Sequence, residues 1–146
     1  MLVRCLYASR SSVPLTSAFL DGILEQSRKN NPLRGITGML CMSDDIFIQV
    51  LEGGRDAVCD LYKAIVGDPR HTNVRLLVYE EITERRFGHW TMGHVDVAKV
   101  NASLLLKYSE KATLDPFGCS GRATLALLDE LVASASIINR GPIRNP

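Results

Sequence analysis

The chain has 146 residues, of which 46% are hydrophobic, so it has enough apolar side chains for one domain with its own core. Its 17 lysines and arginines nearly balance its 16 aspartates and glutamates, which argues against a nucleic-acid binder, and no apolar run approaches the roughly 20 residues of a membrane span. The four cysteines are far apart and match neither a zinc site nor a redox pair, so we expect buried free thiols, a cytoplasmic location and no signal peptide.

The N-terminal part of the chain predicts a strand followed by a helix. Leu2–Ala8 alternates with a period of two, which indicates a strand that points Tyr7 to one face of a sheet. An apolar stripe at helical spacing then predicts a helix that begins near Ser17. Pro32 disfavours a helical residue before it, so this helix should end near Asn30.

The next stretch predicts a hairpin at the centre of the sheet. Ile36–Met42 and Ile46–Glu52 read as strands joined by a polar turn, and both faces of the second strand are mostly apolar. This strand should therefore be covered on both sides. Gln49 is the polar exception in this apolar pattern. A buried amide without hydrogen-bond partners costs roughly 1–3 kcal/mol. Either a protein group or a polar ligand must satisfy it.

The following elements complete the sheet. Apolar residues at helical spacing between Val58 and Val66 predict a second helix, which Gly67-Asp68-Pro69 ends. Val74–Ile82 and Trp90–Val97 read as two further strands, separated by a charged loop. The element order predicts an α+β fold of the ferredoxin-like βαββαβ type with an added strand, a mixed sheet with two helices on one face.

The C-terminal part predicts two more helices. Val97–Tyr108 is moderately helical and Arg122–Ile138 is strongly amphipathic. These helices should cover the second face of the sheet or form a contact with a partner. The predicted domain limits are an α+β domain over 1–97, a helical extension over 98–138 and a frayed tail over 139–146.

The space between the first two helices and the sheet should collect side chains suited to a ligand. These side chains are Tyr7, Ile23, Asn30, Asn31, Gln49, Ile65, Trp90 and Met92. An apolar slot with a few amides and a phenol suits a flat ligand with hydrogen-bonding edges, such as a flavin. Each residue alone is more often an ordinary core or helix-end residue, so periodicity by itself indicates only an α+β domain with a pocket.

Several short motifs occur in unbroken order along residues 2–97. They are Tyr7-Ala8-Ser9, Asn30-Asn31-Pro32, Gly35-Ile36-Thr37-Gly38, Phe47-Ile48-Gln49-Val50-Leu51-Glu52-Gly53, Asp68-Pro69-Arg70-His71, Arg86-Phe87 and Trp90-Thr91-Met92. Together they resemble the BLUF domains, blue-light sensors that use FAD, in their short stand-alone form.

The resemblance implies how a flavin would be held. The ring would lie between the first two helices with Ile23 and Ile65 against its faces, while Asn31 and Asn30 would hold its carbonyl and imide edge. Some relatives carry an arginine near the cofactor's phosphate end where this chain has Ala64. The residues that would compensate are Arg28, Lys29 and His71. FAD is the expected cofactor, with FMN or riboflavin as alternatives.

The resemblance also implies the photochemistry. Gln49 would bridge Tyr7 and the N5/O4 edge of the flavin. Light would draw an electron and a proton from Tyr7, the Gln49 amide would rearrange by rotation or tautomerisation, and the electron and proton would return. Trp90 and Met92 would relay the new hydrogen-bond pattern to the last strand and the C-terminal helices.

The implied output is a population shift read by a separate downstream signalling protein, in a chain that is a homo-oligomer and not an enzyme. Two alternatives remain open. One is a small acylphosphatase-like hydrolase, for which the sequence offers no Ser/His/Asp set, metal cluster or phosphate loop. The other is a non-photoactive interaction module without a cofactor. A yellow protein would argue against both.

Overall fold

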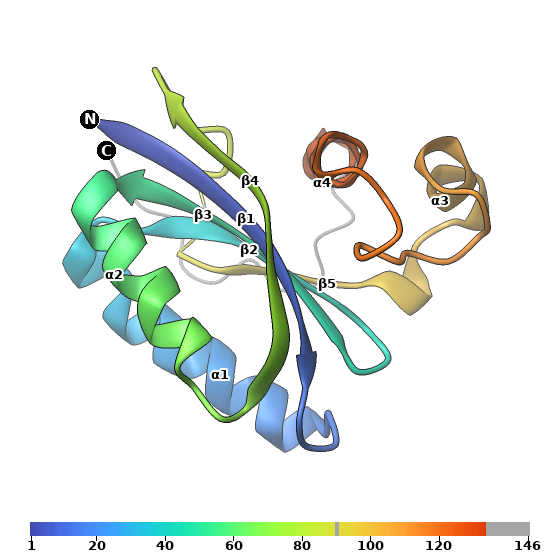
Figure 1. The fold of residues 1–146 in the computed structure, drawn as a ribbon, viewed down its shortest axis with the longest axis horizontal. Helices are drawn as coiled ribbons and strands as arrows, with labels where there is room; N and C mark the ends of the chain where they lie inside the picture. Colours follow the sequence, from blue (N-terminus) through green and yellow to red (C-terminus); the bar gives the residue numbers. More distant parts are fainter. Residues whose placement is uncertain (90, 134–146) are drawn as a thin grey trace.

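The structure is a computed structural model that describes residues 1–89 and 91–133. A five-stranded sheet with the order β4-β1-β3-β2-β5 forms its centre (Figure 1). Strand β5 runs parallel to β2, and the other neighbours are antiparallel. The elements are β1 (Leu2–Ser11), α1 (Ser17–Asn30), η1 (Pro32–Arg34), β2 (Thr37–Ser43), β3 (Ile46–Gly54), α2 (Arg55–Val66), β4 (His71–Ile82), β5 (Gly93–Asp96), η2 (Val97–Lys99), α3 (Ala102–Tyr108) and α4 (Gly121–Ala133). This confirms the predicted ferredoxin-like α+β fold with an added strand.

Both faces of the sheet are covered, as the two-sided apolar pattern of β3 predicts. Helices α1 and α2 lie on one face and helix α4 on the other, with α3 beyond it (Figure 1). Phe47 and Leu51 of β3 belong to the core under α1 and α2. Ile48 and Val50 belong to the core that also contains Leu125 and other leucines of α4. The domain limits at residues 97 and 138 stay predictions.

The last strand is shorter than predicted. It covers Gly93–Asp96 instead of Trp90–Val97, and Trp90 lies outside the described residues. Met92 precedes the strand, and its carbonyl accepts hydrogen bonds from the side chain of Arg28 on α1. The chain then turns through η2 before α3 begins, so the single helix expected over residues 97–108 is divided.

Other element ends differ by a few residues. Strand β4 begins at His71 instead of Val74, and β1 extends to Ser11. Helix α1 ends at Asn30 as predicted, but its N-cap is Thr16, whose Oγ1 accepts a hydrogen bond of 3.1 Å from the backbone N–H of Phe19. The part of the predicted Arg122–Ile138 helix beyond Ala133 lies outside the described residues.

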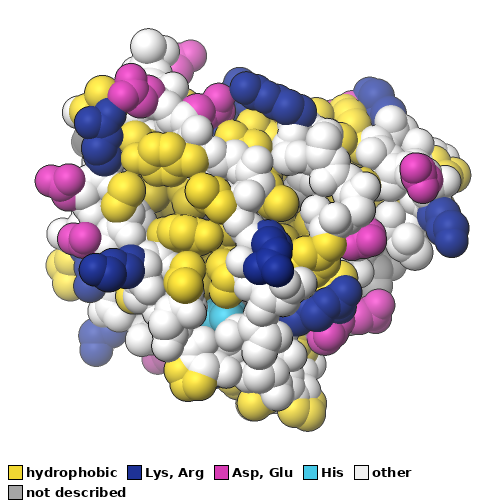
Figure 2. All heavy atoms as spheres, viewed as in Figure 1, with side chains coloured by type: hydrophobic (Ala, Val, Ile, Leu, Met, Phe, Trp, Pro, Cys, Tyr) yellow, Lys and Arg dark blue, Asp and Glu magenta, His cyan; other side chains and the backbone are white. Residues whose placement is uncertain are grey.

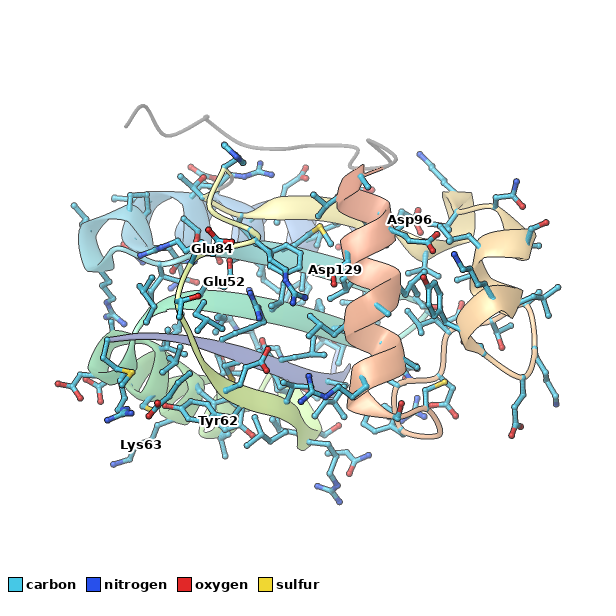
Figure 3. All side chains as sticks on the ribbon, turned by 90° about the horizontal axis from the view of Figure 1, so that it is seen from above. Glu52, Tyr62, Lys63, Glu84, Asp96 and Asp129 are labelled. Carbon is cyan, nitrogen blue, oxygen red and sulfur yellow. The ribbon has the colours of Figure 1, made fainter. Side chains whose placement is uncertain are left out.

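A buried carboxylate fixes the loop between β4 and β5. Glu52 is 0% exposed, and its oxygens accept hydrogen bonds from Arg4 Nε (2.8 Å) and from the backbone N–H groups of Phe87 (2.6 Å) and Arg86 (3.2 Å). Figure 3 shows Glu52 on the sheet beside helix α4, which carries Asp129. Because Arg86 also pairs with Asp129 at 2.8 Å, the loop is tied to both the sheet and α4.

The cysteines are free thiols, but not all of them are buried as expected. Burial raises the pKa of the Cys5 and Cys41 thiols to about 12, whereas Cys59 is exposed on α2. Within residues 1–89 and 91–133, no helix combines the length and the apolar character that a membrane crossing requires.

Candidate functional site

The strand register brings Tyr7 and Gln49 together. They are direct partners in the β1–β3 ladder, so their side chains project side by side toward α1 and α2. The Tyr7 hydroxyl donates a short hydrogen bond to Gln49 Oε1. Gln49 Nε2 in turn donates to the thioether Sδ of Met92 at 3.4 Å. All three side chains are buried, so a phenol, an amide and a thioether form one continuous buried chain.

A cavity of about 230 Å³ opens above this chain of residues, between α1, α2 and the sheet. Tyr7, Gln49, Leu40 and Phe47 form its buried floor. Ile23 of α1 and Ile65 of α2 supply aliphatic walls. The cavity is therefore apolar on its sides and polar at one place on its floor, which suits a planar ring that has polar edges.

Asn31 lines the cavity with an unsatisfied donor. Its position is fixed because its carbonyl accepts hydrogen bonds from the backbone N–H groups of Arg34 (3.0 Å) and Ile36 (2.9 Å), in a turn that Gly35 closes with a φ of 68°. Asn31 is 4% exposed, and its Nδ2 has no hydrogen-bond partner in the part of the chain that the structure describes. A buried amide donor without an acceptor is costly, so a ligand carbonyl would stabilise this arrangement.

Charged groups gather where α2 leads into β4. Arg70 holds Asp68 through Nε (3.0 Å) and Nη2 (2.6 Å), and this hydrogen bonding keeps the pKa of the Asp68 carboxyl below its usual value. His71 shares a hydrogen bond of 2.8 Å between Nδ1 and Ser9 Oγ, and burial lowers its pKa. Together with Arg34 on η1, these residues give the cavity a polar side next to its apolar walls.

Most of the residues that the sequence predicts as flavin contacts line this cavity. They are Tyr7, Ile23, Asn30, Asn31, Gln49, Ile65 and His71. Arg28 and Lys29 are not among the lining residues. Arg28 donates from Nε (3.2 Å) and Nη2 (3.0 Å) to the carbonyl of Met92, and Lys29 is exposed. Neither cation lines the cavity, and their role at the phosphate end of the cofactor stays a prediction.

Sequence reasoning missed part of the lining. The additional residues are Gln26, Ser27, Arg34, Leu40, Phe47, Leu61, Ala64, Asp68 and Arg70. Arg70 directly precedes the candidate ligand residue His71, and Arg34 lies three positions after Asn31, one turn further along the same segment. An arginine this close to a candidate ligand residue is the signal that could have identified both.

The chemistry that this site supports centres on Tyr7. Burial, followed by the nearby Cys5 thiol, raises the pKa of the Tyr7 phenol above its usual value, so the side chain stays neutral near pH 7. A neutral phenol that donates to an amide oxygen can lose an electron and a proton together. The unpaired Asn31 donor, the aliphatic walls and the amide on the floor fit a flavin ring.

Comparisons with known proteins show the family of this chain. The model of the family BLUF, "Sensors of blue-light using FAD", matches residues 2–93. Subunit beta of the photoactivated adenylate cyclase of Euglena gracilis is 36% identical over 87 residues, which are 59% of this chain and 10% of that protein. The chain thus spans about a tenth of the length of the first curated relatives that it matches.

Solved structures match over nearly the whole chain. BlsA in its photo-activated state has a TM-score of 0.79 at 32% identity and covers 90% of this chain and 95% of its own. BlrB, a BLUF protein in its dark state, has a TM-score of 0.77 at 31% identity and covers 92% of this chain and 96% of its own.

Proposed function

The chain belongs to the BLUF family of blue-light sensors that use FAD, and from this premise we propose that it senses light through Tyr7 and Gln49, with a flavin in the cavity between α1 and α2. The domain is a sensor and not an enzyme, which sets the hydrolase alternative aside. The observation that carries the proposal is the buried chain from the Tyr7 hydroxyl through the Gln49 amide to the Met92 thioether.

The residues around the cavity would hold the flavin from three sides. Ile23 and Ile65 would pack against the two faces of the ring, since they lie on opposite helices. The Nδ2 group of Asn31 would donate to a ring carbonyl, and Asn30 on the exposed rim would assist. The Gln49 amide would face the remaining polar edge, because an amide offers both a donor and an acceptor.

A bound flavin would supply light absorption and, when excited, a strong oxidant. Tyr7 would then lose an electron, and its phenolic proton would leave along the hydrogen bond to Gln49 Oε1. The Gln49 amide would rearrange, and Tyr7 would recover both the electron and the proton. In the new arrangement Nε2 would no longer donate to the Met92 thioether, so the packing of Met92 would change.

The identity of the flavin depends on the polar side of the cavity. Arg34 and Arg70 both line it, and the bonds of Arg70 to Asp68 use Nε and Nη2 and do not involve Nη1. These two guanidinium groups would bind the phosphates of FAD, because arginine donates to phosphate oxygens in a planar fork. FMN and riboflavin would use fewer of these contacts.

The signal would leave through the segment that begins at Met92 and continues into β5 and the C-terminal helices, toward a separate signalling protein. Trp90, the other predicted relay residue, lies outside the described residues, and its role stays a prediction.

We also propose a homo-oligomer. It is supported by two exposed residues of edge strand β4, Leu76 at 49% and Tyr79 at 42%. Hydrophobic side chains also gather on the surface between α2 and β4 (Figure 2). The cytoplasmic location stays a prediction.

The test uses the purified full chain in the dark and under blue light. A yellow protein should release FAD on denaturation, and blue light should shift its flavin absorption to longer wavelength, reversibly in the dark. Asn31→Ala should weaken flavin binding about two- to tenfold, the value of one hydrogen bond. A colourless protein that takes up no added flavin, or a spectrum that bleaches to reduced flavin, would refute the proposal.

The oligomer and the partner need a separate measurement. Gel filtration of the dark and illuminated protein, alone and with a candidate partner, should show a mass above that of a 16.1 kDa monomer and a light-dependent complex. Elution of the protein as a monomer in both states would remove the homo-oligomer from the proposal.

A further inference from the structure

Met92 is held from two sides by two different elements. Gln49 on β3 donates to its thioether Sδ at 3.4 Å, and Arg28 on α1 donates to its carbonyl from Nε at 3.2 Å and Nη2 at 3.0 Å. Met92 is 0% exposed, so water does not compete with the bond from Gln49, whereas the bonds from Arg28 are partly buried. The side chain of this residue thus contacts the light-sensing amide, and its backbone contacts a helix.

The strand that follows Met92 is short, and its Val95 is 0% exposed in the core that also contains the leucines of α4. Strand β5 has four residues, lies at the edge of the sheet and pairs with β2 alone. A second cavity, of about 370 Å³, lies beside it, and His94 and Asp96 of β5 face Leu20 and Asp21 of α1 across that space. Because this cavity separates part of β5 from α1, the hydrogen bonds from Arg28 are a main contact that fixes where β5 begins.

We propose that Arg28 is a positioning residue that clamps the Met92 carbonyl and so holds the start of β5 against α1, and that rearrangement of Gln49 loosens this clamp. Arg28 is on a helix that also lines the flavin cavity, so the clamp connects the cavity wall to the output strand. Only the light-dependent half of this inference rests on the proposed function. The clamp itself is a property of the dark protein and is tested without light.

The dark test measures hydrogen–deuterium exchange of the β5 amides by mass spectrometry. Arg28→Ala should speed exchange in Gly93–Asp96 about tenfold, which corresponds to about 1.4 kcal/mol, because the two lost bonds have a charged donor. Arg28→Lys keeps the charge and one donor group, so its β5 exchange should rise less than that of Arg28→Ala. It should also remain folded if the alanine variant does not.

Arg75→Ala is the matched control, since Arg75 also donates to a backbone carbonyl (Val74, 3.1 Å) but lies on the opposite edge strand. Unchanged β5 exchange in both Arg28 variants would overturn the clamp.

The light test follows the carbonyl directly. The protein is labelled with methionine that carries ¹³C at its carbonyl. In the infrared difference between illuminated and dark samples, the bands that this label shifts belong to those of the four methionine carbonyls whose surroundings change. The parent protein should show a Met92 carbonyl band that moves to higher frequency as its hydrogen bonds weaken. Arg28→Ala should lose this band while the flavin red shift is kept, and Arg28→Lys should restore part of it.

The outcomes separate the two proposals. A parent protein without a red shift would refute the photochemistry of Tyr7 and Gln49, and the dark exchange would still decide the clamp. A normal red shift with the same methionine band in the parent and in Arg28→Ala would refute the clamp alone. Loss of the red shift in Arg28→Ala would also refute it, because Arg28 would then act on the flavin itself.

Discussion

Replacing Tyr7 by Phe tests the centre of the mechanism and has a cost that follows from the structure. Tyr7 is 1% exposed, and its hydroxyl donates to Oε1 of Gln49, a residue that is 6% exposed. Removing the hydroxyl leaves a buried carbonyl without this donor, at a cost of about 1–3 kcal/mol in the free energy of unfolding. In a domain of this size, that cost lowers Tm by about 2–12 °C.

The photochemical effect of Tyr7→Phe should be much larger than the effect on stability. The ring remains and still forms the cavity floor, so flavin should stay bound, but the phenol that supplies the electron and proton is gone. Blue light should therefore produce no red shift, which absorption spectroscopy measures directly. Thermal unfolding followed by circular dichroism checks the stability cost.

The matched control is Tyr62→Phe. The ring centroid of Tyr62 lies 5.7 Å from that of Tyr7, so Tyr62 is the nearby tyrosine that tests whether proximity alone suffices. It should keep the full red shift, because the hydroxyl that donates to Gln49 is that of Tyr7. A normal photocycle in Tyr7→Phe would refute the reasoning, whatever the result for Tyr62→Phe.

Three further predictions concern affinity, stability and pH. Arg34→Ala should weaken FAD binding up to about fivefold in fluorescence titrations, because an exposed charge pair contributes up to about 1 kcal/mol. Riboflavin binding should stay unchanged, and equal losses of affinity for both flavins would contradict a phosphate role for Arg34. Glu52→Gln should lower the free energy of unfolding in urea by about 3 kcal/mol, because it breaks a buried ion pair with Arg4 and disturbs the bond from the Phe87 N–H; a loss below about 1 kcal/mol would contradict it. Burial lowers the pKa of His71, so below pH 6.5 the unfolded chain takes up a proton that the folded chain resists, and the free energy of unfolding falls. Above pH 6.5 His71 causes no such loss. His71→Gln should reduce this pH dependence, and an identical pH profile in that variant would count against it.

The sequence determined the backbone plan and the centre of the site. The apolar pattern on both faces of β3 predicts a central strand covered on two sides, because period-two alternation depends only on neighbouring residues. For the same reason Gln49, the exception in that pattern, stands out in the sequence as a buried amide that needs a partner, and the resemblance to the BLUF domains makes it the candidate photochemical amide. The end of α1 at Asn30 follows from Pro32, which is also a local effect.

Only the tertiary structure decided the partners of long polar side chains. Arg28 was a candidate for the phosphate end of a cofactor, but it bonds to the carbonyl of Met92, 64 positions away. Glu52 and Arg4 gave no signal as a buried ion pair, although the β1–β3 register places them opposite each other. A flexible charged side chain can reach many groups, and which one it meets depends on how distant segments pack. Local periodicity therefore fixes the strands and helices, whereas the contact that positions the output strand exists only in the folded chain.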